Sequence, residues 1–264
     1  MSKEMTMLEH LEELRSRLIK IMVALIVIFA IVFSFRIQEY RIGEFSFPFL
    51  YPDIYNNFAM QFVNKIKADV VPEYVQIIVT TPQQAFLSAV YIAIFLSIII
   101  GMPVIIYEIG AFVNPALYPH ERRLILTILG PATALFISGC LFSYTFVIPW
   151  AFAFLYRYAL SFEAMTTITL DSLISFVLLF LFAFGIAFQL PIIMYLLTKM
   201  GVVEPSFWKN NFRVAIVIIV IFGAIITPDG SGITMWFIAL PMLLLYSAGY
   251  LFIKYRVKGK VSTS

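Results

Sequence analysis

Long runs of apolar residues, separated by shorter polar stretches, dominate the hydropathy pattern of this chain. Six runs can be recognised, at residues 18–35, 85–113, 124–155, 172–198, 212–227 and 233–253. A transmembrane helix needs about 20 apolar residues to cross about 30 Å of hydrocarbon, and every run except the fifth approaches or exceeds that length. The pattern therefore predicts an all-α polytopic membrane protein with six transmembrane helices.

Composition supports this class. Of the 264 residues, 62% are hydrophobic and 12% are charged, whereas soluble domains are nearer to half apolar and a quarter charged. The pI of 8.9 is not a sign of nucleic-acid binding, because the basic residues are distributed by membrane side, and we expect no nucleic-acid partner.

The basic residues also orient the chain. Six spans place both termini on one side of the membrane. If that side is the inner one, the inner segments contain Lys3, Arg15, Arg17, Lys20, Arg122, Arg123, Lys199, Lys209, Arg213, Lys254, Arg256, Lys258 and Lys260. The outer segments then contain only Arg36, Arg41, Lys65, Lys67 and Arg157. Lysine and arginine concentrate in cytoplasmic loops, so the N- and C-termini are predicted to be cytoplasmic.

Three of the segments outside the predicted spans can be assigned a position or role. Residues 1–17 form a cytoplasmic amphipathic segment, residues 36–84 form an outer loop that caps the bundle, and residues 254–264 form a basic cytoplasmic tail. Within the loop, an apolar residue recurs every fourth position at Ile54, Phe58, Phe62 and Ile66. This spacing predicts an amphipathic helix over 53–67, and the following stretch, Tyr74–Thr80, has a composition typical of a β-strand.

The sequence HLEELRSRL, residues 10–18, places acidic residues directly before the first span. Leu8, Leu11, Leu14 and Leu18 recur at helical spacing, which leaves Glu13 on another side of the helix, four residues before Arg17. One interpretation is a solvated helix with an i,i+4 ion pair worth about 0.2–0.5 kcal/mol. The other is a binding site for a cationic ligand. This stretch alone favours the first interpretation.

The segment between the second and third spans carries further acids. It reads FVNPALYPHERR, residues 112–123, and its asparagine and prolines end the helix and predict a tight turn. Glu121 follows the turn, and upstream Glu108 and Phe112 share one helical face. Glu121 either pairs with the adjacent arginines or joins Glu13 and Glu108 in an anionic patch. Such a patch would suit guanidinium groups, which carboxylates bind in a bidentate manner.

Two polar positions lie at or near membrane depth. In FQLP, residues 188–191, Pro191 cannot donate to the carbonyl of Ala187, so the fourth span is predicted to kink there. Gln189 then either makes a helix–helix hydrogen bond or faces a polar cavity. Asp229, in the sequence TPDG, is best interpreted as a turn residue on the outer side.

Enzyme chemistry is not indicated. The sequence has no phosphate-binding loop, no metal-ligand cluster and no nucleophile with a neighbouring base, so we expect no catalytic residues, no metal and no cofactor. Cys140 is the only cysteine, which excludes a disulfide within the chain. A different function class, a proton-coupled small-molecule transporter using Glu108, Glu121 and Gln189, is an alternative. Against it, Gln189 does not titrate and no internal repeat is evident.

Several of these motifs together resemble the TatC family, the six-span core subunit of the twin-arginine protein translocase. The resemblance rests on HLEELRSRL, FVNPALYPHERR, AFGIAFQLP, and ITPD followed by IALP, and it runs from about residue 8 to residue 253. It implies that residues 1–264 form a single domain, folded as a concave, glove-like helical bundle. It also implies that this domain lies in the cell membrane. It further implies recognition of signal peptides bearing two consecutive arginines, and export of folded proteins driven by the proton-motive force.

The resemblance also implies roles for particular residues. The family's signal-binding carboxylates fall on Glu13 and Glu121, and a companion arginine falls on Arg15. The aromatic and proline of the second site fall on Phe112 and Pro115, with Leu117 and Tyr118 beside them. Glu108 stands where relatives often have a neutral polar residue and would add a third carboxylate. Gln189 occupies the polar position of the fourth span, where many relatives have glutamate.

Partners follow from the same resemblance. We expect single-span membrane proteins of the TatA and TatB type, signal peptides of folded cargo, the lipid bilayer, and other copies of the chain within the translocase. The short fifth span would favour local thinning of the bilayer. We therefore expect partner helices to dock on the fifth and sixth spans, with Thr227 as a candidate polar contact beside Asp229.

Overall fold

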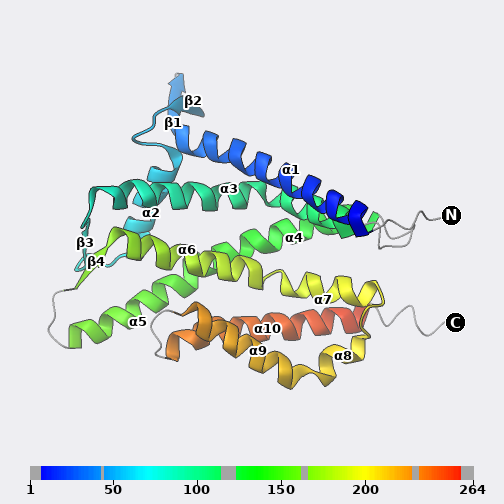
Figure 1. Ribbon diagram of the computed structural model, residues 1–264. Helices are drawn as coiled ribbons and strands as arrows, with labels where there is room; N and C mark the ends of the chain where they lie inside the picture. The colour runs from blue at the N-terminus through cyan, green and yellow to red at the C-terminus, as the bar shows by residue number, and fades with distance from the viewer. Residues whose placement is uncertain (1–6, 43–44, 114–122, 162–165, 228–231, 257–264) are drawn as a thin grey trace. The chain divides into compact units, whose positions relative to one another are not determined.

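The computed structural model describes residues 7–42, 45–113, 123–161, 166–227 and 232–256 (Figure 1). The chain divides into two compact units. The first comprises residues 1–133 and 159–178, and the second comprises residues 134–158 and 179–264. The third and fourth apolar runs pass from one unit into the other. Whether the chain forms the single domain expected from the sequence stays a prediction.

Long helices account for most of the predicted spans. In the described part of the chain, five apolar helices are long enough to cross a membrane: Leu8–Ser34, Pro82–Phe112, Thr127–Ser161, Leu170–Lys199 and Ile233–Tyr255. The fifth predicted span corresponds to a shorter apolar helix, Phe212–Ile226. The all-α polytopic class is therefore confirmed. The count of six spans and the cytoplasmic termini remain predictions.

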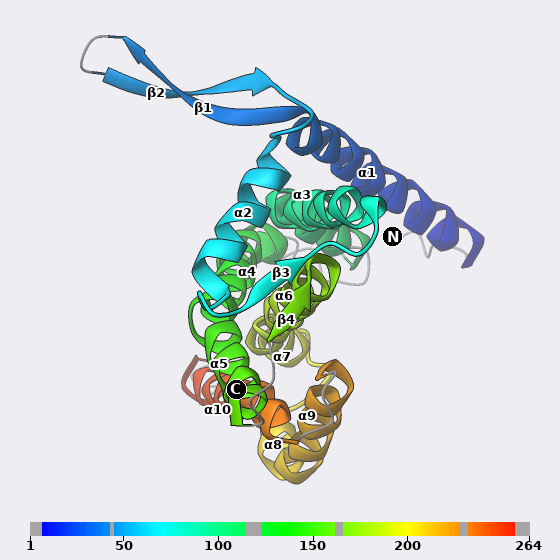
Figure 2. The same ribbon diagram turned by 90° about the vertical axis from the view of Figure 1, so that its left-hand side faces the viewer.

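The first unit is built on two long helices that pack side by side, α1 (Met7–Ser34) and α3 (Pro82–Val113) (Figures 1 and 2). From Met7 onward, the amphipathic segment and the first span are thus one continuous helix. Between α1 and α3 the chain forms an antiparallel hairpin of β1 (Phe35–Ile42) and β2 (Phe45–Pro52), then α2 (Phe58–Val70) and the short strand β3 (Gln76–Ile78). The hydropathy pattern of the sequence does not predict this hairpin.

The helix predicted over 53–67 begins and ends later in the structure. Asp53 accepts hydrogen bonds from the backbone N–H groups of Tyr55 and Asn56, both at 3.0 Å, which holds a turn there. Asn57 then caps α2, its Oδ1 accepting from the N–H of Met60 at 2.9 Å. The predicted apolar stripe is also wrong in part, because Ile54 is exposed and the buried residues are Ala59, Val63, Ile66 and Val70. Local turn chemistry decided the starting residue.

The third apolar run is helical over a longer range than predicted. It consists of α4 (Arg123–Phe142), a single π-helical turn labelled η2 (Ser143–Val147), and α5 (Ile148–Ser161). The π turn ends two residues before Pro149. In an α-helix the ring of that proline would clash with the carbonyl of Thr145, and the wider turn gives it room. After α5, β4 (Thr167–Thr169) pairs in parallel with β3.

The kink predicted in the fourth run is confirmed. The helix breaks between α6 (Leu170–Ala187) and α7 (Leu190–Lys199). At the break, the N–H of Gln189 bonds to the carbonyl of Ile186 at 2.9 Å, a tighter turn than an α-helix has. Pro191 follows in the first turn of α7, where its missing N–H costs nothing.

The second unit is completed by α8 (Pro205–Asn210), α9 (Phe212–Ile226) and α10 (Ile233–Arg256), with α10 packed on α7, α8 and α9. Trp208 of α8 joins these helices. Its Nε1–H donates to the hydroxyl of Thr198 at 2.8 Å, and its carbonyl accepts from the hydroxyl of Tyr246 at 2.7 Å. The 15 residues of α9 span about 22 Å, which is shorter than a typical hydrocarbon core.

Candidate functional site

The acidic candidates of α1 and α3 meet through one arginine. The guanidinium of Arg17 donates to Glu13 Oε1 from Nη2 at 2.8 Å and from Nε at 3.1 Å. Its Nη1 donates to Glu108 Oε2 at 2.8 Å. Side-chain exposure is 22% for Arg17, 20% for Glu13 and 10% for Glu108. One planar guanidinium therefore bridges two carboxylates from helices that are far apart in sequence.

Helical spacing explains the positions of these groups. Glu13 and Arg17 are four residues apart and so lie on one face of α1. Glu108 lies in the last two turns of α3, on the side that packs against α1. Next along the same contact, the rings of His10 and Phe112 stack with centroids 4.4 Å apart and planes 16° from parallel. The spacing of four between Glu108 and Phe112 matches this arrangement.

The site carries net negative charge. Two carboxylates face one guanidinium, which stays protonated in proteins, so one carboxylate charge is not balanced within this trio. Charge-assisted bonds of this kind are roughly twice as strong as neutral ones. Both carboxylates of this arrangement are thus bonded to a guanidinium.

The structure changes the interpretation of the leucine stripe. Leu8, Leu11 and Leu18 are exposed, by 74%, 59% and 51%, while the face with Glu13 and Arg17 packs against α3. The i,i+4 ion pair expected from the sequence is confirmed. The solvated helix face that the first interpretation expected is wrong, because the neighbouring helix α3 largely covers the Glu13–Arg17 pair.

Comparison with known proteins identifies the chain. Residues 9–241 match the family model for the Sec-independent protein translocase protein TatC. The chain is 42% identical over 259 residues to the TatC protein of Cenarchaeum symbiosum, covering 98% of each chain. It is 35% identical to the TatC protein of Aquifex aeolicus, covering 92% of each. The chain belongs to the TatC family.

A solved structure agrees. The crystal structure of a twin-arginine translocase receptor, TatC, is similar to this chain with a TM-score of 0.75 and 33% sequence identity, covering 94% of this chain and 99% of that one. As a TatC protein, the chain is a multi-pass protein of the cell membrane and a core subunit of the twin-arginine translocase complex. It is not an enzyme. The family decides against the small-molecule transporter that the sequence left as an alternative.

Other predicted site residues of this TatC protein fall in different settings. Arg15 is exposed on α1, beyond the bridge. Pro115, Leu117, Tyr118, Glu121 and Asp229 lie outside the described residues. The structure therefore brings together Glu13, Glu108 and, one turn away, Phe112.

Two predicted polar site residues, Gln189 and Thr227, lie in the second unit. Gln189 is half-buried at the break between α6 and α7. Thr227 is 6% exposed, and its hydroxyl donates to the carbonyl of Gly223 at 3.0 Å. In this chain the Thr227 hydroxyl thus bonds to its own helix.

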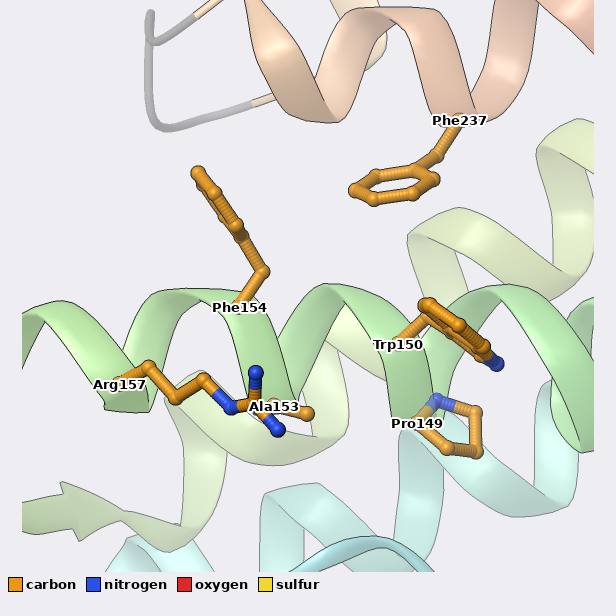
Figure 3. A pocket seen from close by; sticks show the side chains of 6 residues that line it. All are labelled: Pro149, Trp150, Ala153, Phe154, Arg157 and Phe237. Carbon is orange, nitrogen blue, oxygen red and sulfur yellow. The ribbon is translucent and has the colours of Figure 1, made fainter.

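A cavity of about 500 Å³ lies beside α5 in the second unit (Figure 3). Figure 3 shows Phe237 of α10 facing the α5 side chains. The lining consists of Pro149, Trp150, Ala153, Phe154, Arg157 and Phe237. These residues include no nucleophile, general acid or metal ligand. Among the described residues, no group of three or more His, Cys, Asp or Glu side chains could hold a metal.

Sequence reasoning missed two members of the α1–α3 site. Arg17 was assigned only to a local pair, although it also reaches Glu108, and His10 was not connected with Phe112. Both lie on the helical face of Glu13, at spacings of four and three. The sequence shows that Glu108 and Phe112 share a face of α3 with a spacing of four. Only the packing of α1 on α3 shows that these two faces are in contact.

Proposed function

We propose that this TatC protein is the receptor for twin-arginine signal peptides, and that Glu13 and Glu108 contribute to the binding site. The observation that carries the proposal is the bridge itself, in which Arg17 is held by carboxylates from two helices. A bound peptide arginine would occupy the same type of position. Arg17 then acts as an internal occupant that the peptide displaces or moves aside.

The site extends to further residues. Glu121 supplies a carboxylate for the second arginine of the peptide, and Phe112, Pro115, Leu117 and Tyr118 form the apolar surroundings. Arg15, exposed beside the bridge, limits the approach of other basic segments. Cargo is a folded protein, and the proton-motive force drives its transfer in concert with single-span TatA- and TatB-type partners and other copies of the chain.

Peptide binding tests this function. We expect Glu13→Gln and Glu121→Gln each to weaken binding of a twin-arginine peptide about tenfold, because each removes a charge-assisted hydrogen bond worth about 1.5 kcal/mol or more. Because Arg17 already bonds to Glu13, the loss of peptide affinity in Glu13→Gln should be smaller than that for a carboxylate with no internal partner. Replacing the peptide arginines by lysine should also weaken binding, since an ammonium lacks the planar fork. Fluorescence anisotropy with the full chain in nanodiscs measures both effects.

The matched control is Glu12→Gln. Glu12 is exposed on the same helix turn and its replacement removes the same charge. If Glu12→Gln weakens binding as much as Glu13→Gln, only the overall charge of the segment matters. If Glu13→Gln and Glu121→Gln both bind the peptide normally, the receptor site lies elsewhere.

We further propose that single-span partner helices dock on α9 and α10. An exposed stripe at helical spacing runs along α9, formed by Val214, Val217, Ile218, Ile221 and Ile225. A short partner helix would share the thinned bilayer around this 15-residue helix. The polar groups that we propose to take part in partner contacts and transport are Gln189, Thr227 and Asp229.

Disulfide crosslinking tests the docking face. In a Cys140→Ala background, Ile221→Cys on the stripe should crosslink to a cysteine in the partner helix. Ile219→Cys is the control, because Ile219 is 3% exposed and faces the interior of its unit. Crosslinks that form only on the first and third spans, both at rest and during transport, would show that partners dock elsewhere.

A further inference from the structure

The β1–β2 hairpin is a prominent feature that the proposed receptor function does not use. Its two strands of eight residues begin where α1 ends. Figure 2 shows it projecting sideways, away from α1, α2 and α3. Figure 1, turned by 90°, shows that it extends across the direction in which α1 and α3 run. A two-stranded ribbon is marginally stable in water by itself, so its surroundings should contribute to holding it.

The base of the hairpin is fixed to the helices. Arg36 Nη1 pairs with Asp53 Oδ2 at 3.2 Å. The side-chain amide of Gln61 on α2 donates to the Ile37 carbonyl at 3.0 Å and accepts from the Ile37 N–H at 3.4 Å. The N–H of Asp53 bonds to the last carbonyl of α1, at Ser34. These contacts hold the direction in which the ribbon leaves the helices.

One face of the ribbon is aromatic. Side chains alternate between the two faces of a strand, and in this register Arg36 is opposite Tyr51 and Gln38 is opposite Phe49. Phe47, Phe49 and Tyr51 therefore share a face, and each is more than half exposed. The Arg36 guanidinium lies over the Tyr51 ring, 5.2 Å from its centroid. Glu39, opposite Pro48, belongs to the other face.

We propose that the hairpin lies on the membrane surface, with its aromatic face, Phe47, Phe49 and Tyr51, in the headgroup region of the bilayer. The exposed apolar surface of α1, including Ile26, Val27 and Ile31, leads directly to the base of the ribbon. The ribbon begins at the end of a transmembrane helix and extends across the direction of that helix. It therefore extends along the membrane surface. Tyrosine is enriched at that level, where its ring and its hydroxyl are both accommodated, and phenylalanine is typical of the apolar face of elements that lie in the plane of the interface.

The strand edge argues against a second copy as the occupant. Pro48 and Pro52 lie in β2 and have no N–H to donate. Prolines of this kind blunt a strand edge for pairing with another strand. The bilayer needs no such donors, because it contacts the face of the ribbon and not its edge. Held at its base and resting on the membrane, the hairpin resists tilting of α1.

Spin-label accessibility tests this inference. The full chain, in a Cys140→Ala background, carries a nitroxide at Phe49→Cys or at Glu39→Cys in single-copy nanodiscs of phosphatidylcholine and phosphatidylglycerol. Collisions with oxygen report lipid, and collisions with a water-soluble nickel chelate report solvent. We expect the label at 49 to favour oxygen and the label at 39 to favour the nickel chelate. Tyr51→Cys, on the same face as Phe49, repeats the test should Phe49→Cys fail to fold.

Three results would overturn the inference. Access of the nickel chelate to both labels would place the hairpin in water. Oxygen access at 39 with nickel access at 49 would place the opposite face on the membrane. Protection of 49 in vesicles with many copies, but not in single-copy nanodiscs, would show that another copy of the chain covers this face.

Discussion

Replacement of Arg17 by glutamine is expected to lower the free energy of unfolding by about 3 kcal/mol. Removing one partner of a buried ion pair typically costs about 3–5 kcal/mol, because the remaining charge is left uncompensated. Here two carboxylates lose their shared partner, and their side chains are only 20% and 10% exposed. That residual exposure places the loss at the lower end of the range. Steric trapping or denaturant titration in bicelles measures it.

A double replacement separates charge from packing. In Arg17→Gln, the further change Glu108→Gln should recover much of the lost stability, since it removes the more deeply buried charge. The non-additivity of the two changes then measures the interaction energy between Arg17 and Glu108. Arg15→Gln is the matched control, because Arg15 is exposed two residues away, and surface changes usually stay within about 0.5 kcal/mol. Equal losses for Arg17→Gln and Arg15→Gln would contradict a structural role for the bridge.

Gly139→Ala is expected to cost about 1–3 kcal/mol, the range for overpacking a close-packed interior. A Cβ at this position would lie 2.5 Å from the carbonyl oxygen of Phe184 and 2.8 Å from Cγ of Phe188. Backbone cannot move aside as a flexible side chain can, so α4 and α6 would have to separate. Small residues allow this close approach of membrane helices. Thermal denaturation of the purified chain, followed by circular dichroism, measures the loss.

Gly130→Ala on the same helix is the control. A Cβ there has no atom within 4 Å, and alanine favours a helix over glycine by up to about 1 kcal/mol. This variant should be as stable as the wild type or more so. If Gly139→Ala proved equally harmless, the two helices would be less tightly packed at this point than the structure shows.

Local features of this protein were predictable from sequence because each depends on a few neighbouring residues. Apolar run length indicated the membrane class, since every backbone polar group in lipid must be bonded within its own helix or barrel. Pro191 predicted the break between α6 and α7, because the missing N–H and the ring act on the preceding turn. The spacing of Glu13 and Arg17 predicted their pair. The motifs that resemble TatC indicated the family, which the comparisons confirmed.

Tertiary packing decided what joins distant parts of the chain. Glu108 meets Arg17 across 91 positions, and no local pattern specifies which face of α3 lies against α1. The same packing turned the Glu13 side of α1 inward and left the leucines exposed, contrary to the solvated interpretation. The hairpin also escaped the sequence pattern, since its apolar face is exposed and not buried against a core. In a membrane protein, hydrophobicity determines which segments enter the bilayer, while close fit and hydrogen bonding determine how they pair.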